Sequence, residues 1–184
     1  MFDETNFVNQ LKSGNETTFR TLFLDYKEGV FNTSLHLLQN ESDAMDVMQD
    51  VFLEIFQSIH TFQGKSALST WIYRICVNKS LEVIRKRKRF FTFSLTQNQS
   101  ANKRSKEDWV HPGVVLEQKE QARKLYSAIA RLKDKEQISF TLFHIQGFSQ
   151  KEISEITEQS IPAVETQIHR AKQKLAQWLI AEKL

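Results

Sequence analysis

The chain has 184 residues, of which 40% are hydrophobic and 26% charged, with 5 Gly and 2 Pro, a composition that argues against a disordered chain and against a turn-rich sandwich or barrel. The single Cys excludes an intramolecular disulfide, and no Cys/His cluster has metal-ligand spacing. No apolar run exceeds four residues, and the N-terminus lacks a signal peptide. We therefore expect a cytoplasmic protein with no cofactor, no metal and no membrane insertion. The formal net charge of +3 is distributed unevenly along the chain. Residues 1–64 carry 3 basic and 10 acidic side chains, residues 65–106 carry 11 basic and 1 acidic, and residues 107–184 carry 11 of each kind. This distribution suggests two different partners, one of them a polyanion.

Helical periodicity runs through the first half of the chain. It predicts a short helix that includes Phe7 and Leu11, a second helix at about residues 16–38 and a third that begins after Asn40 as N-cap. The third helix has an apolar stripe expected to face the core, formed by Met48, Val51, Phe52, Ile55, Phe56 and Ile59. A loop over residues 60–69 precedes a fourth helix at about 70–88, whose apolar side includes Cys76 as a core residue.

Residues 90–113 are rich in Gln, Asn, Ser and Lys and predict a linker. Further helices are expected at about 114–132 and 134–146. Asp134 with Gln137 resembles a capping box, and Ser149 with Glu152 forms a full one. The prediction is therefore an all-α chain of two small helical domains, 1–89 and 114–184, joined by a flexible linker over 90–113.

A short helix, a tight turn and a longer helix over residues 149–178 fit a helix-turn-helix. The second helix of this motif enters the major groove of DNA, and its N-terminal residues contact base edges. The residues that would meet bases are Ala163, Thr166, Gln167 and Arg170, with Ser160 and Lys172 available for phosphates. The same spacing fits a helical hairpin with no DNA role.

Two charged segments allow a functional and a simpler interpretation. The basic run at residues 85–89 suits a helix end favoured by the helix dipole, but five consecutive basic residues exceed what a cap needs, and phosphate binding is favoured. Neighbouring aromatic residues suit stacking on unpaired bases. The acidic stripe of Asp43, Asp46, Asp50 and Glu54 fits a solvated face and a protein-docking surface equally well.

Nothing in the sequence predicts an enzyme. The histidines at positions 36, 60, 111, 144 and 169 fall on different expected elements, and no motif surrounds any of them. The chain has no P-loop, no metalloprotease motif and no nucleophile elbow. We therefore expect no catalytic residues.

Several segments resemble a known family, the bacterial sigma-70 factors and most closely their extracytoplasmic-function (ECF) group. The likeness to sigma region 2 rests on DAMDVMQDVFLEIF at 43–56, FQGKS at 62–66 and TWIYRICVN at 70–78. The likeness to the region 4 helix-turn-helix rests on FSQKEISEI at 148–156 and VETQIHRAK at 164–172. The resemblance implies a non-catalytic initiation subunit whose partners are core RNA polymerase (the β′ coiled coil and the β subunit), promoter DNA and an anti-sigma factor.

The resemblance also implies roles for individual residues. The helix that docks on the β′ coiled coil corresponds to Asp43, Asp46, Gln49, Asp50 and Glu54. The reader of the minus-ten element corresponds to Phe62, Lys65, Ser66, Trp71, Arg74, Asn78, Arg85 and Lys86. Within that group Phe62 and Asn78 match the positions that capture an unstacked base. Contacts to the captured base offset the free energy that unstacking it requires. The reader of the minus-thirty-five element corresponds to the helix-turn-helix residues named above, which are Ser160, Ala163, Thr166, Gln167, Arg170 and Lys172.

The chain departs from the family pattern in region 4. Family members often carry Lys or Arg where this chain has Glu165 and Gln167. Glu can accept from cytosine N4 and Gln can pair with adenine, while a Glu165 that points to solvent is the simpler alternative. Two other functions stay open on the sequence: a stand-alone helix-turn-helix regulator, and a membrane-surface protein that uses residues 85–93.

Overall fold

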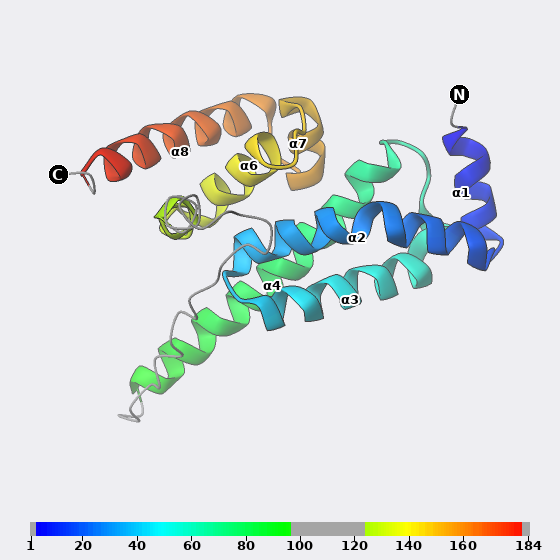
Figure 1. Cartoon of the computed structure of the whole chain (residues 1–184), viewed down its shortest axis with the longest axis horizontal. Helices are drawn as coiled ribbons and strands as arrows, with labels where there is room; N and C mark the ends of the chain where they lie inside the picture. Colours follow the sequence, from blue (N-terminus) through cyan, green and yellow to red (C-terminus); the bar gives the residue numbers. More distant parts are fainter. Residues whose placement is uncertain (1–2, 97–123, 182–184) are drawn as a thin grey trace, which may run out of the picture.

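The computed structural model describes residues 3–96 and 124–181, and its elements are all helices within those ranges (Figure 1). The first half contains α1 (Glu4–Lys12), α2 (Glu16–Leu38), α3 (Glu41–Ser58), the 3-10 turn η1 (Ile59–Thr61) and α4 (Leu68–Thr96). The second half contains a short helical segment at 124–129, then α6 (Asp134–His144), α7 (Gln150–Thr157) and α8 (Ile161–Ala181). The predicted all-α fold is confirmed.

Polar side chains fix where the helices begin. The Asn15 side chain accepts a hydrogen bond from the Thr18 amide at 3.0 Å at the start of α2, and the Asn40 side chain accepts one from the Asp43 amide at 2.8 Å at the start of α3. Each bond satisfies a helix N-terminal amide that has no partner within the helix. The prediction that Asn40 caps the third helix is confirmed.

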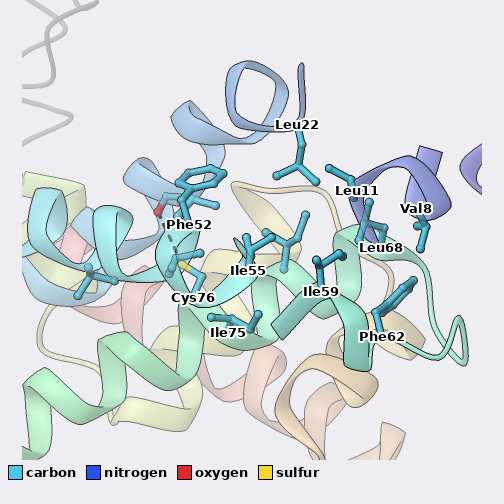
Figure 2. Packing of buried hydrophobic residues seen from close by; sticks show 14 of the residues in the cluster. Val8, Leu11, Leu22, Phe52, Ile55, Ile59, Phe62, Leu68, Ile75 and Cys76 are labelled. Atoms are coloured by element: carbon cyan, nitrogen blue, oxygen red, sulfur yellow. Dashed lines mark hydrogen bonds between the residues drawn. The ribbon is translucent and has the colours of Figure 1, made fainter. Parts of the chain in front are cut away.

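The core of the first half forms where α1, α2, α3 and α4 meet (Figure 2). Its fully buried members include Leu22, Ile55 and Ile72. Cys76 is also fully buried, with its Sγ 3.4 Å from Ser34 Oγ, and burial raises the pKa of its thiol to about 11. A buried, protonated thiol agrees with the predicted core role of Cys76.

Two helix boundaries differ from the prediction. The fourth helix, expected to end near residue 88, continues to Thr96, so the first part of the expected linker is helical and the end of α4 extends beyond its neighbours in Figure 1. The remainder of that linker, 97–113, and most of the helix expected at 114–132 lie outside the described residues. At α6 the expected pairing of Asp134 with Gln137 is wrong, because the Glu136 carboxylate accepts from the Lys133 amide at 3.4 Å, one residue earlier.

The two halves pack against each other through a shared apolar cluster. Leu37 of α2 and Tyr73 and Val77 of α4 pack with residues of α6, α7 and α8, namely Ile138, Leu142, Ile153, Ile156, Val164 and Ile168. In Figure 1 the group α6–α8 accordingly lies beside α2 and α4. Within residues 3–96 and 124–181, no helix is both long and apolar enough to cross a lipid bilayer.

Candidate nucleic-acid and protein interfaces

The predicted docking stripe on α3 divides into two kinds of residue. Asp46, Gln49 and Asp50 are exposed and lie on one face of the helix. Asp43 instead forms an ion pair with Arg87 of α4, and Glu54 forms one with Lys79 of α4 at 2.6 Å. The hydrogen bond to Glu54 raises the pKa of Lys79. Asp43 and Glu54 therefore fasten α3 to α4, while the three central residues present their side chains to solvent.

Apolar side chains that the sequence analysis missed continue this exposed face. Leu53 is 55% exposed and Phe56 is 62% exposed, although the periodicity predicted Phe56 for the core. The Phe56 and Phe19 rings pack in a T-shaped arrangement at a centroid distance of 5.4 Å. Both rings line a pocket of about 340 Å³ between the α1–α2 turn and the end of α3. The face of α3 therefore combines acidic and apolar contacts.

The loop before α4 holds its aromatic residue in the core. Phe62 is only 5% exposed, and its ring centroid lies 5.4 Å from that of Trp71. Lys12 Nζ donates to the Phe62 carbonyl at 2.6 Å, which ties the loop to α1. Lys65 is exposed and Ser66 is half-buried in the same loop. In this conformation the buried Phe62 ring packs the loop against the core and does not line an open pocket for a base.

The predicted reading face of α4 is partly occupied by α7. The Arg74 guanidinium donates two hydrogen bonds to the main-chain carbonyl of Glu155, from Nε at 3.1 Å and from Nη2 at 2.6 Å. Asn78, one turn later, is exposed, as are Arg85 and Lys86 at the start of the basic run. The sequence could not reveal that α7 would cover part of this face, because the contact joins segments about 80 residues apart.

The helix-turn-helix is built as predicted at its first helix. The Ser149 hydroxyl accepts from the Glu152 amide at 3.3 Å, and the Glu152 carboxylate accepts from the Ser149 amide at 2.8 Å. The Ser149 hydroxyl also donates to the Glu152 carboxylate at 2.7 Å, and this bond, followed by the one from the Ser149 amide, lowers the pKa of Glu152. The turn between α7 and α8 has Glu158 in the left-handed region, with φ of 55°, and the Ser154 hydroxyl donates to the Gln159 carbonyl across it.

The second helix presents most of the predicted DNA readers to solvent, with one exception. Ser160, Thr166, Arg170 and Lys172 are exposed, and Ala163 is half-buried. Gln167 instead faces the domain interior. Its Oε1 accepts from the Ser139 hydroxyl at 2.7 Å and its Nε2 donates to Gln159 Oε1 at 2.7 Å. In this conformation both polar atoms of Gln167 are used to hold α8 in place, so they do not face an incoming base.

No cluster of metal-ligating side chains accompanies these surfaces in the part of the chain that the structure describes. No group of three or more His, Cys, Asp or Glu side chains in residues 3–96 and 124–181 could hold a metal ion. The two interfaces consist of an exposed acidic and apolar face on α3 and basic or polar faces on α4 and α8. Such surfaces suit binding to macromolecules.

Comparisons with known proteins indicate the family of this chain. The family profile for Sigma-70 region 2 matches residues 22–90, and that for Sigma-70 region 4 matches residues 122–175. The ECF RNA polymerase sigma factor SigW of Bacillus subtilis is 27% identical over 176 residues, 94% of each chain. The ECF RNA polymerase sigma-E factor of Escherichia coli K12 is 23% identical over 172 residues, covering 91% of this chain and 90% of its own.

Two solved structures share the fold. CnrH, in complex with the cytosolic domain of CnrY, superimposes with a TM-score of 0.72 at 24% identity and 97% coverage of both chains. The sigma factor RpoE of Bartonella quintana, in complex with the anti-sigma factor NepR, gives a TM-score of 0.72 at 19% identity, with 88% of this chain and 96% of its own covered. The chain belongs to the sigma-70 family of transcription initiation factors, as a member of its ECF group.

Proposed function

We propose that this sigma factor binds core RNA polymerase through the exposed face of α3 and directs it to promoters. The observation that carries this proposal is the juxtaposition of Asp46 and Asp50 with the exposed apolar side chains of Leu53 and Phe56. Acidic residues would meet the basic β′ coiled coil, and an apolar anchor beside them would supply burial at the centre of the contact. Asp43 and Glu54, which are paired within the chain, would act by holding α3 in position.

The proposed DNA contacts use two different surfaces. Region 4 would read duplex DNA at the minus-thirty-five element through the exposed side of α8, with Thr166 and Arg170 at the bases and Lys172 and Ser160 at the phosphates. Region 2 would read and trap melted minus-ten DNA through Asn78, Arg74 and the loop that carries Lys65, with Arg85 and Lys86 on the phosphates. The exposure of Thr166, Arg170, Asn78 and Arg85 supports these roles.

Other features of the proposal follow from the family. Sigma factors are non-catalytic initiation subunits, so we propose that this chain has no enzymatic activity of its own and acts in the cytoplasm, where polymerase and DNA are found. We also propose an anti-sigma factor as a partner, since NepR occupies that role for the Bartonella quintana RpoE. The β subunit of polymerase would hold region 4 at the promoter.

The test is run-off transcription with purified core enzyme. The chain with core enzyme alone is expected to start transcription from a promoter selected out of random DNA, whereas a stand-alone helix-turn-helix regulator cannot. The doubly reversed variant Asp46→Lys/Asp50→Lys is expected to lose core binding in a pull-down by about tenfold or more, because it places positive charge against a basic surface.

A matched control separates the docking face from net charge. Asp25→Lys/Glu28→Lys makes the same change of charge at exposed positions of α2 and is expected to bind core enzyme normally. Equal binding by wild type and Asp46→Lys/Asp50→Lys would refute the α3 docking face. A failure of wild type to bind core enzyme would refute the function itself.

A further inference from the structure

Two polar side chains near the start of α8 already use their hydrogen-bonding groups within region 4. The Thr166 hydroxyl donates to the Pro162 carbonyl, one turn earlier, at 2.8 Å. Gln167 accepts from the Ser139 hydroxyl and donates to the Gln159 side chain, both at 2.7 Å. A hydrogen that is donated within the fold is not available to a base. In this conformation, polar readout of a duplex therefore depends on other side chains of α8.

Glu165 and Arg170 are exposed charged side chains on the same part of α8. Among residues 3–96 and 124–181, neither of them has a hydrogen-bond or ion-pair partner. They are five residues apart in the sequence, which corresponds to about 7.5 Å along a helix axis. Base pairs of a duplex are stacked about 3.4 Å apart. Both side chains can therefore reach one short stretch of the major groove, at pairs about two steps apart.

The helix itself gains little from a carboxylate at position 165. Attraction between an acidic side chain and the helix dipole is confined to the first turn, and Glu165 is the fifth residue of α8. A stabilising ion pair along a helix needs Lys or Arg three or four residues away. The residues at those spacings are Ile161, Pro162, Ile168 and His169. Substitution of Glu165 should therefore leave the fold of region 4 intact.

A carboxylate on a helix that reads DNA weakens binding to most sequences. The duplex is a polyanion, so an unpaired Glu165 lowers the affinity through repulsion between like charges. Residues 107–184 carry 11 basic and 11 acidic side chains, so this part of the chain has no excess of positive charge to offset the repulsion. The penalty is relieved only where a base edge offers the carboxylate a hydrogen-bond donor. Glu165 therefore discriminates between sequences that carry such a donor and those that do not.

The four bases differ in what they offer a carboxylate in the major groove. Guanine presents two acceptors, N7 and O6, and thymine presents the O4 acceptor and a methyl group. Adenine has the N6 donor, but its N7 acceptor lies beside that donor and repels the second carboxylate oxygen. Cytosine presents the N4 donor without an acceptor on the same base edge. An ionised Glu side chain is therefore matched best by cytosine.

We propose that Glu165 is a specificity-determining residue of region 4, which accepts a hydrogen bond from cytosine N4 in the minus-thirty-five element and disfavours the other three bases at that position. Arg170 donates to O6 and N7 of a guanine about two base pairs away. The preferred element therefore contains a cytosine and a guanine at a fixed separation. This inference rests on the proposed function, because it names the base that the exposed side of α8 selects.

Selection from promoter duplexes randomised over the minus-thirty-five region tests the assignment. Holoenzymes reconstituted with wild type, Glu165→Gln and Glu165→Ala are compared by sequencing the bound DNA. Wild type is expected to enrich cytosine at one position at least about fivefold over each other base. Glu165→Gln is expected to enrich adenine at that position, because a Gln amide can pair with adenine N6 and N7. Glu165→Ala should show no preference there, and enrichment at the remaining positions should not change.

Affinity measurements on two fixed duplexes separate base readout from charge. The duplexes differ only in cytosine or thymine at the selected position, so the N4 donor is replaced by the O4 acceptor. The ratio of the two affinities should be at least about fivefold for wild type and close to one for Glu165→Ala. Glu165→Gln and Glu165→Ala have the same charge, so any difference between them reports hydrogen bonding. Glu28→Gln, at an exposed position of α2, removes the same charge elsewhere and should keep the wild-type ratio.

The outcomes distinguish this inference from the proposed function. If Glu165→Ala binds the cytosine and thymine duplexes more tightly than wild type by the same factor, Glu165 acts only through repulsion and the inference is overturned. Selection of the same base by all three holoenzymes also overturns it. In both cases the wild-type holoenzyme still selects a promoter, and the proposed function stands. A wild-type holoenzyme that selects no minus-thirty-five sequence overturns the proposed reading role of α8 and this inference with it.

Discussion

The rings of Phe62 and Trp71 pack with their centroids 5.4 Å apart, and Phe62 is 5% exposed at the edge of the core of α1–α4. The residue that the family resemblance assigns to base capture is thus also a structural residue in this conformation. Its two roles predict different experimental signatures from those of Asn78, which is exposed on α4.

Phe62→Ala is expected to lower the free energy of unfolding by about 3 kcal/mol, because it empties a buried aromatic site. Asn78→Ala should change it by no more than about 0.5 kcal/mol, as for an exposed residue. Urea denaturation followed by circular dichroism measures both. Asn78→Ala is also expected to weaken open-complex formation far more than duplex binding. Equal loss of open-complex formation and of duplex binding would exclude Asn78 from base capture.

Glu54→Gln is expected to lower the free energy of unfolding by about 0.2–1 kcal/mol near pH 8, because it removes the 2.6 Å ion pair with Lys79. The pKa of Lys79 is raised in the folded chain from its usual 10.5, with the hydrogen bond to Glu54 as the largest cause. The stabilisation is therefore fully present below about pH 10.5 and is lost as the pH rises through the raised value. The difference between wild type and Glu54→Gln should narrow in that range.

Chemical denaturation at a series of pH values measures this difference. Glu28→Gln, at an exposed position of α2, is the control and should show no such narrowing. A difference between wild type and Glu54→Gln that stays constant through pH 11 would show that the pair does not stabilise the chain through the charge of Lys79.

Ser149→Ala is expected to destabilise region 4 by about 1 kcal/mol at neutral pH, because α7 loses its N-cap. The pKa of Glu152 is lowered from 4.5, with the Ser149 hydroxyl as the largest cause and the Ser149 amide next. A lowered carboxyl pKa stabilises the fold above about pH 4.5, and this contribution is lost as the pH falls through the lowered value. Thermal melting from pH 7 to pH 3 should therefore show a weaker acid dependence in Ser149→Ala. An acid dependence identical to that of wild type would contradict the coupling.

Gln167→Ala and Arg170→Ala should affect different properties: the first should lower stability, and the second should weaken DNA binding. Gln167→Ala loses bonds to Ser139 and Gln159 and is expected to lower the free energy of unfolding by about 1–2 kcal/mol without changing base preference. Arg170→Ala should leave stability nearly unchanged and weaken holoenzyme binding to duplex DNA, measured as affinity against salt concentration. A stable Gln167→Ala variant with an altered base preference would show that Gln167 turns outward on DNA.

The local features of the fold could be predicted from the sequence because they depend on residues close together in the chain. Helical periodicity, the Asn40 cap and the box formed by Ser149 and Glu152 involve partners within four residues of each other. The helix-turn-helix and the acidic face of α3 are likewise local patterns. The resemblance to sigma regions 2 and 4 then indicated the family, which the family profiles confirmed.

Orientation and pairing between distant segments were decided by the tertiary structure. Phe56 lies on a helix whose apolar stripe is wider than the core it covers, so packing with α2 and α4 buries Ile55 and leaves Phe56 outside. Gln167 faces inward because Ser139, far away in the sequence, offers it a hydrogen bond. By itself the sequence determined the helices, the separation of acidic from basic segments and the family. The tertiary structure alone decided that α7 covers Arg74, because burial of Tyr73 and Val77 depends on side chains about 80 residues further along the chain.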